Sequence, residues 1–244
     1  MQELKDGQQL IWLCDDSAFS VALDNIFDPS FWSQRDALIG KAAGRGTTVF
    51  FEHQQRQFAL RHYHRGGMAA KISEDQYLYL GARKSRAYQE LKLLLRLQEL
   101  GLNAPRPIAA RIVRNGIYYR ADLITEKIPK AQDLAQRLYA QALPQKVWQD
   151  IAATVAQFHN HGVNHPDLNL RNIMLDANEQ VWLIDFDRGT IANANARIAQ
   201  TNIERLKRSL IKELAKGKGL HWKESDWDGF ETTYKLQKTV IKGG

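Results

Sequence analysis

The sequence predicts an α+β protein built from two lobes, a small β-rich N-terminal lobe and a larger, mainly helical C-terminal lobe. Short β-like segments separated by turns dominate the first half, and long amphipathic helical patterns dominate the second half. No apolar run approaches the roughly 18 residues that span a bilayer. We expect the lobes to cover residues 1–126 and 127–244 and to form one domain overall.

The first lobe is predicted from two hairpins and one helix. Segments 49–51 and 58–63 flank a polar turn, and a glycine cluster at 40–46 comes before them. Segments 109–114 and 117–124 flank an Asn-Gly pair, which tolerates positive φ and is typical of a hairpin turn. Between the hairpins, apolar residues recur at helical spacing over 83–100.

The second lobe is predicted to be helical around one small hairpin. Pro144 suits the first position of a helix whose apolar stripe runs from Val147 to His159 and ends at Gly162. Two short apolar strands, 173–176 and 181–184, flank a turn, and a second long helix is expected over about 195–215.

The net charge of the chain indicates what kind of partner it binds. The formal charge of +7 favours an anionic partner such as nucleic acid, lipid headgroups or an acidic small molecule. The basic run from Arg205 to Lys218 is read mainly as a solvated helix face. Cys14 is the only cysteine, so an intrachain disulfide is impossible, and the polar N-terminal residues lack the apolar core of a secretory leader.

Three oxygen-bearing side chains carry the most specific pattern in the chain. Asp167 precedes Asn172 by five residues, and two apolar strands then lead to Asp185. An amide oxygen and a carboxylate brought together by a hairpin suit Mg²⁺, which requires hard oxygen ligands. A carboxylate on the same loop can orient an acceptor hydroxyl and take its proton. The pattern therefore predicts phosphoryl transfer from ATP, with Asp167 catalytic and Asn172 and Asp185 binding the metal.

This pattern resembles the catalytic and metal-binding loops of the protein-kinase-like superfamily. His165-Pro166-Asp167 stands at the His-Arg-Asp position, and Asp185-Phe186-Asp187 stands at the Asp-Phe-Gly position. The resemblance implies a bilobal kinase fold that binds ATP and Mg²⁺. It also assigns nucleotide-binding roles to the glycine-rich loop, to a cation with its acidic partner, and to the connection between the lobes. The corresponding residues are Gly44, Gly46, Arg61, Glu90 and Glu126.

Three departures from the protein-kinase pattern bear on the substrate. Arg61 replaces the usual lysine, and a planar guanidinium is not equivalent to an ammonium. Asn169 replaces the lysine that often follows the catalytic aspartate by two residues. No long activation segment follows Asp187, so a peptide-binding platform is missing and a small-molecule or lipid-linked acceptor is favoured.

Ordered strings along the chain resemble one branch of the superfamily, the bacterial 3-deoxy-D-manno-octulosonic acid (Kdo) kinases. The resemblance covers about residues 10–235. The strings are Gly44-Arg45-Gly46-Thr47-Thr48, Leu60-Arg61-His62-Tyr63-His64-Arg65-Gly66-Gly67, Tyr119-Arg120-Ala121-Asp122-Leu123, Asp167-Leu168-Asn169, Leu183-Ile184-Asp185-Phe186-Asp187-Arg188-Gly189 and Arg205-Leu206-Lys207-Arg208-Ser209-Leu210.

The resemblance implies ATP-dependent phosphorylation of the 4-hydroxyl of Kdo on a lipid A precursor, in lipopolysaccharide core biosynthesis. It also implies a cytoplasmic enzyme peripherally associated with the inner membrane. Because Kdo and lipid A are anionic, Arg65, Arg171 and Arg188 are candidates for binding the acceptor. Trp222 and Trp227 in the basic tail are candidates for contact with headgroups, although core packing is the simpler role.

Two alternatives belong to different functional classes. An aminoglycoside-type phosphotransferase shares the His-x-Asp-x-x-x-x-Asn loop, but its cationic substrates call for an acidic acceptor site. A catalytically silent kinase-like binding module is suggested by Arg61 and opposed by the presence of Asp167, Asn172 and Asp185. We expect no nucleic-acid partner and no obligate protein partner.

Overall fold

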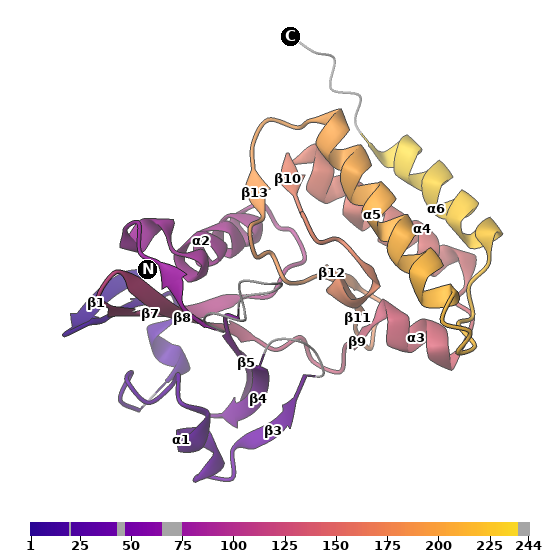
Figure 1. The fold of residues 1–244 in the computed structure, drawn as a ribbon. Helices are drawn as coiled ribbons and strands as arrows, with labels where there is room; N and C mark the ends of the chain where they lie inside the picture. The colour runs from indigo at the N-terminus through magenta and orange to yellow at the C-terminus, as the bar shows by residue number, and fades with distance from the viewer. Residues whose placement is uncertain (20, 43–46, 65–74, 239–244) are drawn as a thin grey trace. The chain divides into compact units, whose positions relative to one another are not determined.

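The computed structural model describes residues 1–19, 21–42, 47–64 and 75–238. The chain forms two compact units, each assembled from two segments. The first unit is Met1–Leu95 with Pro105–Lys127, and the second is Arg96–Ala104 with Ile128–Gly244. Figure 1 shows the large sheet in the N-terminal part of the chain and the long helices α4, α5 and α6 in the C-terminal part. The predicted α+β class, with a sheet-rich N-terminal region and a helical C-terminal region, is confirmed.

An eight-stranded antiparallel sheet organises the first unit. Its order is β1-β2-β7-β8-β5-β4-β3, and β6 also pairs with β8. The strands are β1 Gln2–Asp6, β2 Gln9–Leu13, β3 Leu38–Lys41, β4 Thr47–His53, β5 Arg56–His62, β6 Tyr77–Leu78, β7 Pro107–Asn115 and β8 Tyr118–Glu126. The short helix α1 (Pro29–Ser33) and helix α2 (Arg86–Glu99) complete this part of the chain.

Alternation along β5 separates the core of the first unit from its charged side chains. Phe58 and Leu60 are buried in an aromatic and aliphatic cluster, in which the ring of Trp32 stacks on Phe51 at a centroid distance of 4.2 Å. Arg61 and Tyr63 alternate with these residues and contact Glu90 on α2. Strand alternation therefore places the core and the charged pair on opposite faces of β5.

Helices and two small sheets form the second unit. Figure 1 shows α4 and α6 next to each other, and these two helices pack together. The helices are α3 Leu134–Ala140, α4 Gln145–Asn160, α5 Ala196–Leu214 and α6 Glu224–Gln237. The small sheets join β9 (Gln132–Asp133), β11 (Ile173–Leu175) and β12 (Val181–Leu183), and β10 (Val163–Asn164) with β13 (Thr190–Ile191).

Gly162 directs the chain from α4 into the strand before the predicted catalytic loop. Its φ is +72°, which an L side chain rarely adopts, and a Cβ there would lie 1.7 Å from the carbonyl oxygen of Ala192. The backbones at Gly162 and Ala192 must nevertheless lie this close together, because the Ala192 amide donates a hydrogen bond to the Gly162 carbonyl (3.1 Å). The predicted end of the helix at Gly162 is thus confirmed, and glycine is required there.

Most predicted elements are present, with shifted boundaries. Pro144 is the residue preceding α4 and not its first helical residue, and β7 begins at Pro107, two residues before the predicted strand 109–114. The predicted helix over 83–100 begins at Arg86, after a single 3-10 turn. The sequence analysis missed β1, β2, α1, α3 and α6. Burial raises the pKa of the Cys14 thiol to about 11.

Candidate active site

The loop between β10 and β11 is held by hydrogen bonds to one backbone carbonyl. The side-chain amides of Asn169 and Asn172 both donate to the carbonyl oxygen of Asp167, at 2.8 and 2.9 Å. The Asn169 Oδ1 accepts a hydrogen bond from the amide of Arg171 (2.8 Å), so the Asn169 side chain stabilises the turn. Because the Asn172 nitrogen is used within the loop, its Oδ1 is the atom available for a ligand. The Asp167 carboxylate is exposed.

His165 joins this loop to the segment that carries Asp185. Its Nε2 lies 2.9 Å from the carbonyl oxygen of Ile184, and its ring packs on Phe186 with centroids 4.8 Å apart. Burial lowers the pKa of His165. A neutral, buried imidazole fits a connecting role, with Nε2–H as the donor to Ile184, and does not suit proton transfer to an acceptor.

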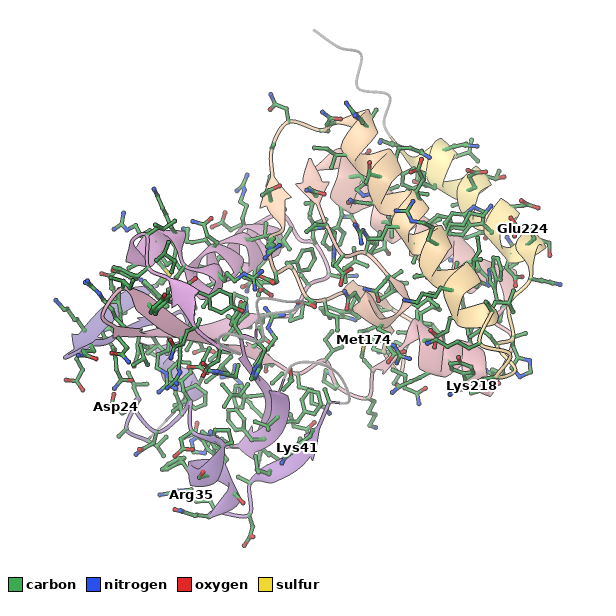
Figure 2. The ribbon with its side chains drawn as sticks, viewed as in Figure 1. Asp24, Arg35, Lys41, Met174, Lys218 and Glu224 are labelled. Carbon is green, nitrogen blue, oxygen red and sulfur yellow. The ribbon has the colours of Figure 1, made fainter. Side chains whose placement is uncertain are left out.

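Asn172 and Asp185 are neighbours across the small sheet. The pairing of β11 with β12 ends in a hydrogen bond from the Ile184 amide to the Asn172 carbonyl (3.0 Å), and Asp185 is the next residue. Figure 2 labels Met174, which lies on β11 two residues after Asn172. Asp185 has a φ of 63° and is itself exposed. Asn172 and Asp185 therefore come from adjacent positions of the same hairpin.

These donors fit a magnesium ion that keeps non-protein ligands. Among the residues that the structure describes, no cluster of three or more His, Cys, Asp and Glu side chains could hold a metal by itself. Mg²⁺ is usually bound through one or two carboxylates together with phosphate oxygens and water. One carboxylate at Asp185 and one amide oxygen at Asn172 match that donor set.

In the first unit, the predicted partners Arg61 and Glu90 are brought together. The Arg61 guanidinium donates to the Glu90 carboxylate, and the Tyr63 hydroxyl donates to the same carboxylate at 2.7 Å. The Arg61 guanidinium also lies 4.5 Å from the centre of the Tyr63 ring. The sequence analysis missed Tyr63, although its place two residues after Arg61 on a strand puts both on one face.

Helix α5 contacts the predicted catalytic loop, residues 165–172, along its length, which the sequence analysis also missed. The Oδ1 of Asn202 accepts from the His165 amide (2.9 Å), and the Oγ of Ser209 accepts from the Leu170 amide (3.3 Å). Between them, Arg205 Nη1 lies 3.7 Å from Asp167 Oδ1. The basic run was predicted to be mainly a solvated helix face, and Arg205 is exposed on that face while it also pairs with Asp167.

The remaining predicted residues lie in varied settings. Gly44, Gly46 and Arg65 fall outside the described residues, although the strands on either side of the glycine loop, β3 and β4, pair as expected for a hairpin. Figure 2 labels Lys41, the last residue of β3. Glu126 ends β8, and its amide donates to the Arg106 carbonyl (2.9 Å), so contact with adenine would have to use other backbone groups of the connection.

The two described arginine candidates differ in their partners. Arg171 Nη2 lies 3.3 Å from Glu213 Oε1, and its Nη1 lies 4.0 Å from Asp133 Oδ2, so it is held by two carboxylates. Arg188 is exposed, with a φ of 60°, in the turn after Asp187. Of these two, Arg188 is the better placed to meet an external anion.

A sheet-rich N-terminal part followed by a helical C-terminal part is the arrangement of the protein-kinase-like class. The family model for the lipopolysaccharide kinase (Kdo/WaaP) family matches residues 29–234, and the chain belongs to this family.

Curated relatives are similar in sequence to this chain over nearly their whole length. A protein of Vibrio parahaemolyticus is 43% identical over 93% of this chain and 94% of its own length. A protein of Photobacterium profundum is 43% identical over 97% and 99%, and one of Haemophilus influenzae is 38% identical over 96% and 99%. All three are named 3-deoxy-D-manno-octulosonic acid kinase. These findings favour the Kdo kinase interpretation over both alternatives.

Proposed function

We propose that this protein transfers the γ-phosphoryl group of ATP to the 4-hydroxyl of Kdo on a lipid A precursor. The observation that carries the proposal is the catalytic loop, in which the Asp167 carbonyl fixes Asn169 and Asn172 while the Asp167 carboxylate stays exposed. Family membership and the names of the relatives support the choice of acceptor.

The reaction needs a base at the acceptor and fixed positive charge at the phosphates. As the acceptor oxygen bonds to the γ-phosphorus, the bond from that phosphorus to the bridging oxygen of ADP breaks, and the hydroxyl proton passes to the Asp167 carboxylate. Arg61 is proposed to contact the ATP phosphates, with Glu90 and Tyr63 holding its guanidinium in place. Asn172 and Asp185 would hold Mg²⁺, which when bound neutralises phosphate charge.

The test is a mass measurement on a Kdo-lipid A precursor incubated with ATP, Mg²⁺ and the protein. We expect a gain of one phosphate on the Kdo, with fragmentation and NMR placing it on the 4-oxygen. A phosphate on the glucosamine backbone, or none at all, would contradict the proposed acceptor. A cationic aminoglycoside incubated in parallel should gain no phosphate.

We also propose that the protein binds peripherally to an anionic membrane surface. In the described ranges, no helix combines the length and apolarity needed to cross a bilayer. The tryptophans suggested for headgroup contact are buried, because Trp222 is only 8% and Trp227 only 2% exposed. Membrane contact must therefore use another surface.

The edge of the sheet near β6 supplies such a surface, which we call the β6 patch. Leu78 pairs with Tyr118, and the Tyr79 amide donates to the Ile117 carbonyl (2.8 Å), so these segments lie side by side. The patch consists of Leu78, Leu80, Ile117 and Tyr118, with exposures of 50, 66, 63 and 40%. The cations Arg83, Lys84, Arg114 and Arg120 belong to the same or adjacent segments. An apolar patch with basic neighbours suits an anionic lipid surface.

Vesicle co-sedimentation tests this assignment. The doubly substituted protein Leu80→Glu, Ile117→Glu should bind vesicles rich in anionic phospholipid at least several-fold more weakly than the wild type. Its activity on a de-acylated, water-soluble Kdo acceptor should be unchanged. Leu236→Glu, at an exposed leucine on α6, is the matched control. Equal vesicle binding by all three proteins would rule out the β6 patch.

A further inference from the structure

The cation within the catalytic loop, Arg171, is held by other carboxylates, because it lies 3.3 Å from Glu213 and 4.0 Å from Asp133. Asn169 stands where many protein kinases carry a lysine, and both ends of its amide are used inside the loop. Phosphoryl transfer spreads negative charge over the oxygens of the transferred group, so a positive group is needed at that point. The proposed function places Arg61 and Mg²⁺ at the phosphates of ATP and assigns no protein cation beside Asp167.

We propose that Arg205 supplies this charge from helix α5. Its guanidinium lies 3.7 Å from the Asp167 carboxylate, and both side chains are partly exposed, at 44 and 64%. In the part of the chain that the structure describes, this is the one ion pair of Arg205. A guanidinium has five donors, so Arg205 can contact phosphoryl oxygens while it remains beside Asp167.

The position of Arg205 is set by contacts on both sides of it. Asn202 binds the His165 amide one turn earlier, and Ser209 binds the Leu170 amide one turn later. Glu213, another turn on, accepts from Arg171 (3.3 Å). Residues at this spacing share one face of a helix. Because α5 is fixed against the loop at three other points, the placement of Arg205 does not depend on the weak ion pair itself.

Other cations of α5 do not share this position. Lys207 pairs with Glu224 at 2.7 Å, and Arg208 lies 3.8 Å from Glu204 on the helix surface. Figure 2 labels Glu224, which begins α6. Arg208 is therefore a matched control: it is the same residue type on the same helix, paired away from the loop.

The test compares Arg205→Ala with Arg208→Ala on the Kdo glycolipid. For Arg205→Ala we expect kcat to fall by about 10²- to 10³-fold, as when one donor to a transition-state oxyanion is lost. KM values for ATP and acceptor should change by less than about threefold. Arg208→Ala should retain wild-type kinetics, and neither change should lower the melting temperature, because exposed pairs contribute little to stability.

Chemical rescue separates a catalytic role from a structural one. Added guanidinium ion at millimolar concentration should restore part of the kcat of Arg205→Ala and should not accelerate Arg208→Ala. The inference is overturned if Arg205→Ala keeps wild-type kcat, if its defect is confined to acceptor KM, or if guanidinium gives no rescue. The role of Arg205 rests on the proposed function. The wild-type assay distinguishes the two proposals, because an inactive wild-type protein would contradict the proposed function and not the role of Arg205.

Discussion

The candidate site residues of the two units hold their charged side chains in opposite ways. In the first unit, Glu90 is buried and its carboxylate accepts from Arg61 and Tyr63. In the second unit, Asp167 and Asp185 are exposed, and hydrogen bonds of the backbone and of neutral amides shape the loops that carry them. The first arrangement satisfies its charges internally, whereas the second presents charge outward.

This difference separates a positioning role from a chemical one. A buried carboxylate with two donors is a fixed support, since removing a partner leaves an uncompensated charge. An exposed carboxylate on a rigid loop is accessible to a substrate hydroxyl or to a cation. We therefore expect substitutions in the first unit to affect stability and ATP binding, and those in the second unit to affect turnover.

The largest effect is expected at Asp167. Asp167→Asn keeps the shape of the side chain and the backbone carbonyl that holds Asn169 and Asn172, but it removes the base. We expect kcat to fall on the order of 10³- to 10⁴-fold, with ATP binding and melting temperature unchanged. Asp150→Asn, at another partly exposed aspartate of the second unit, should behave as wild type. Turnover of Asp167→Asn within tenfold of wild type would remove Asp167 from its role.

The second prediction concerns the buried carboxylate of the first unit. Glu90→Gln removes the negative charge beside Arg61, so we expect the free energy of unfolding to fall by about 3 kcal/mol and the KM for ATP to rise. The control is Glu99→Gln, which breaks the exposed pair of Arg96 and Glu99 (2.8 Å) on the same helix. That change should cost less than about 1 kcal/mol. Denaturant unfolding and ATP titration would check both, and equal losses in the two variants would contradict the distinction between the units.

The sequence predicted the parts of the site that are local in the chain. Asp167 and Asn172 share one loop, and two apolar strands with a turn between them lead to Asp185, so spacing alone places them together. The pairing of Arg61 with Glu90 followed from a resemblance, and the structure confirms the contact. The nucleotide-binding role of that pair stays a prediction.

What could not be predicted depends on distant partners. Asn202 meets the His165 amide across 37 residues, and Ser209 meets the Leu170 amide across 39. The polar stripe of α5 is visible in the sequence, but it does not reveal which surface the helix meets. Strands β1 and β2 were missed for a different reason: they are short, and they are stabilised by pairing, β2 with the distant strand β7 and β1 with β2.

The smallest predicted effect is the change of stability with pH, which should have opposite signs in the two units. His62 lies 2.7 Å from Asp122 Oδ1 and 3.4 Å from Asp75 Oδ2, and its hydrogen bond to Asp122 raises its pKa. The stability that protonated His62 provides is present below the unfolded pKa and is lost as pH rises through the folded value. In the second unit, burial lowers the pKa of His159 from 6.5 to about 4.

His159 should therefore destabilise the second unit in acid. Its ring contacts the Tyr234 hydroxyl (2.7 Å) and Asn202 Oδ1 (3.3 Å), which suits a neutral imidazole with Nε2–H as donor. Because the unfolded histidine takes up its proton first, stability present above pH 6.5 is lost as pH falls towards 4. Hydrogen exchange at pH 5 and pH 8 should show α4 and α6 less protected at pH 5, and His159→Gln should reduce the difference. If His159→Gln leaves the pH dependence of protection unchanged, a group other than His159 controls that dependence.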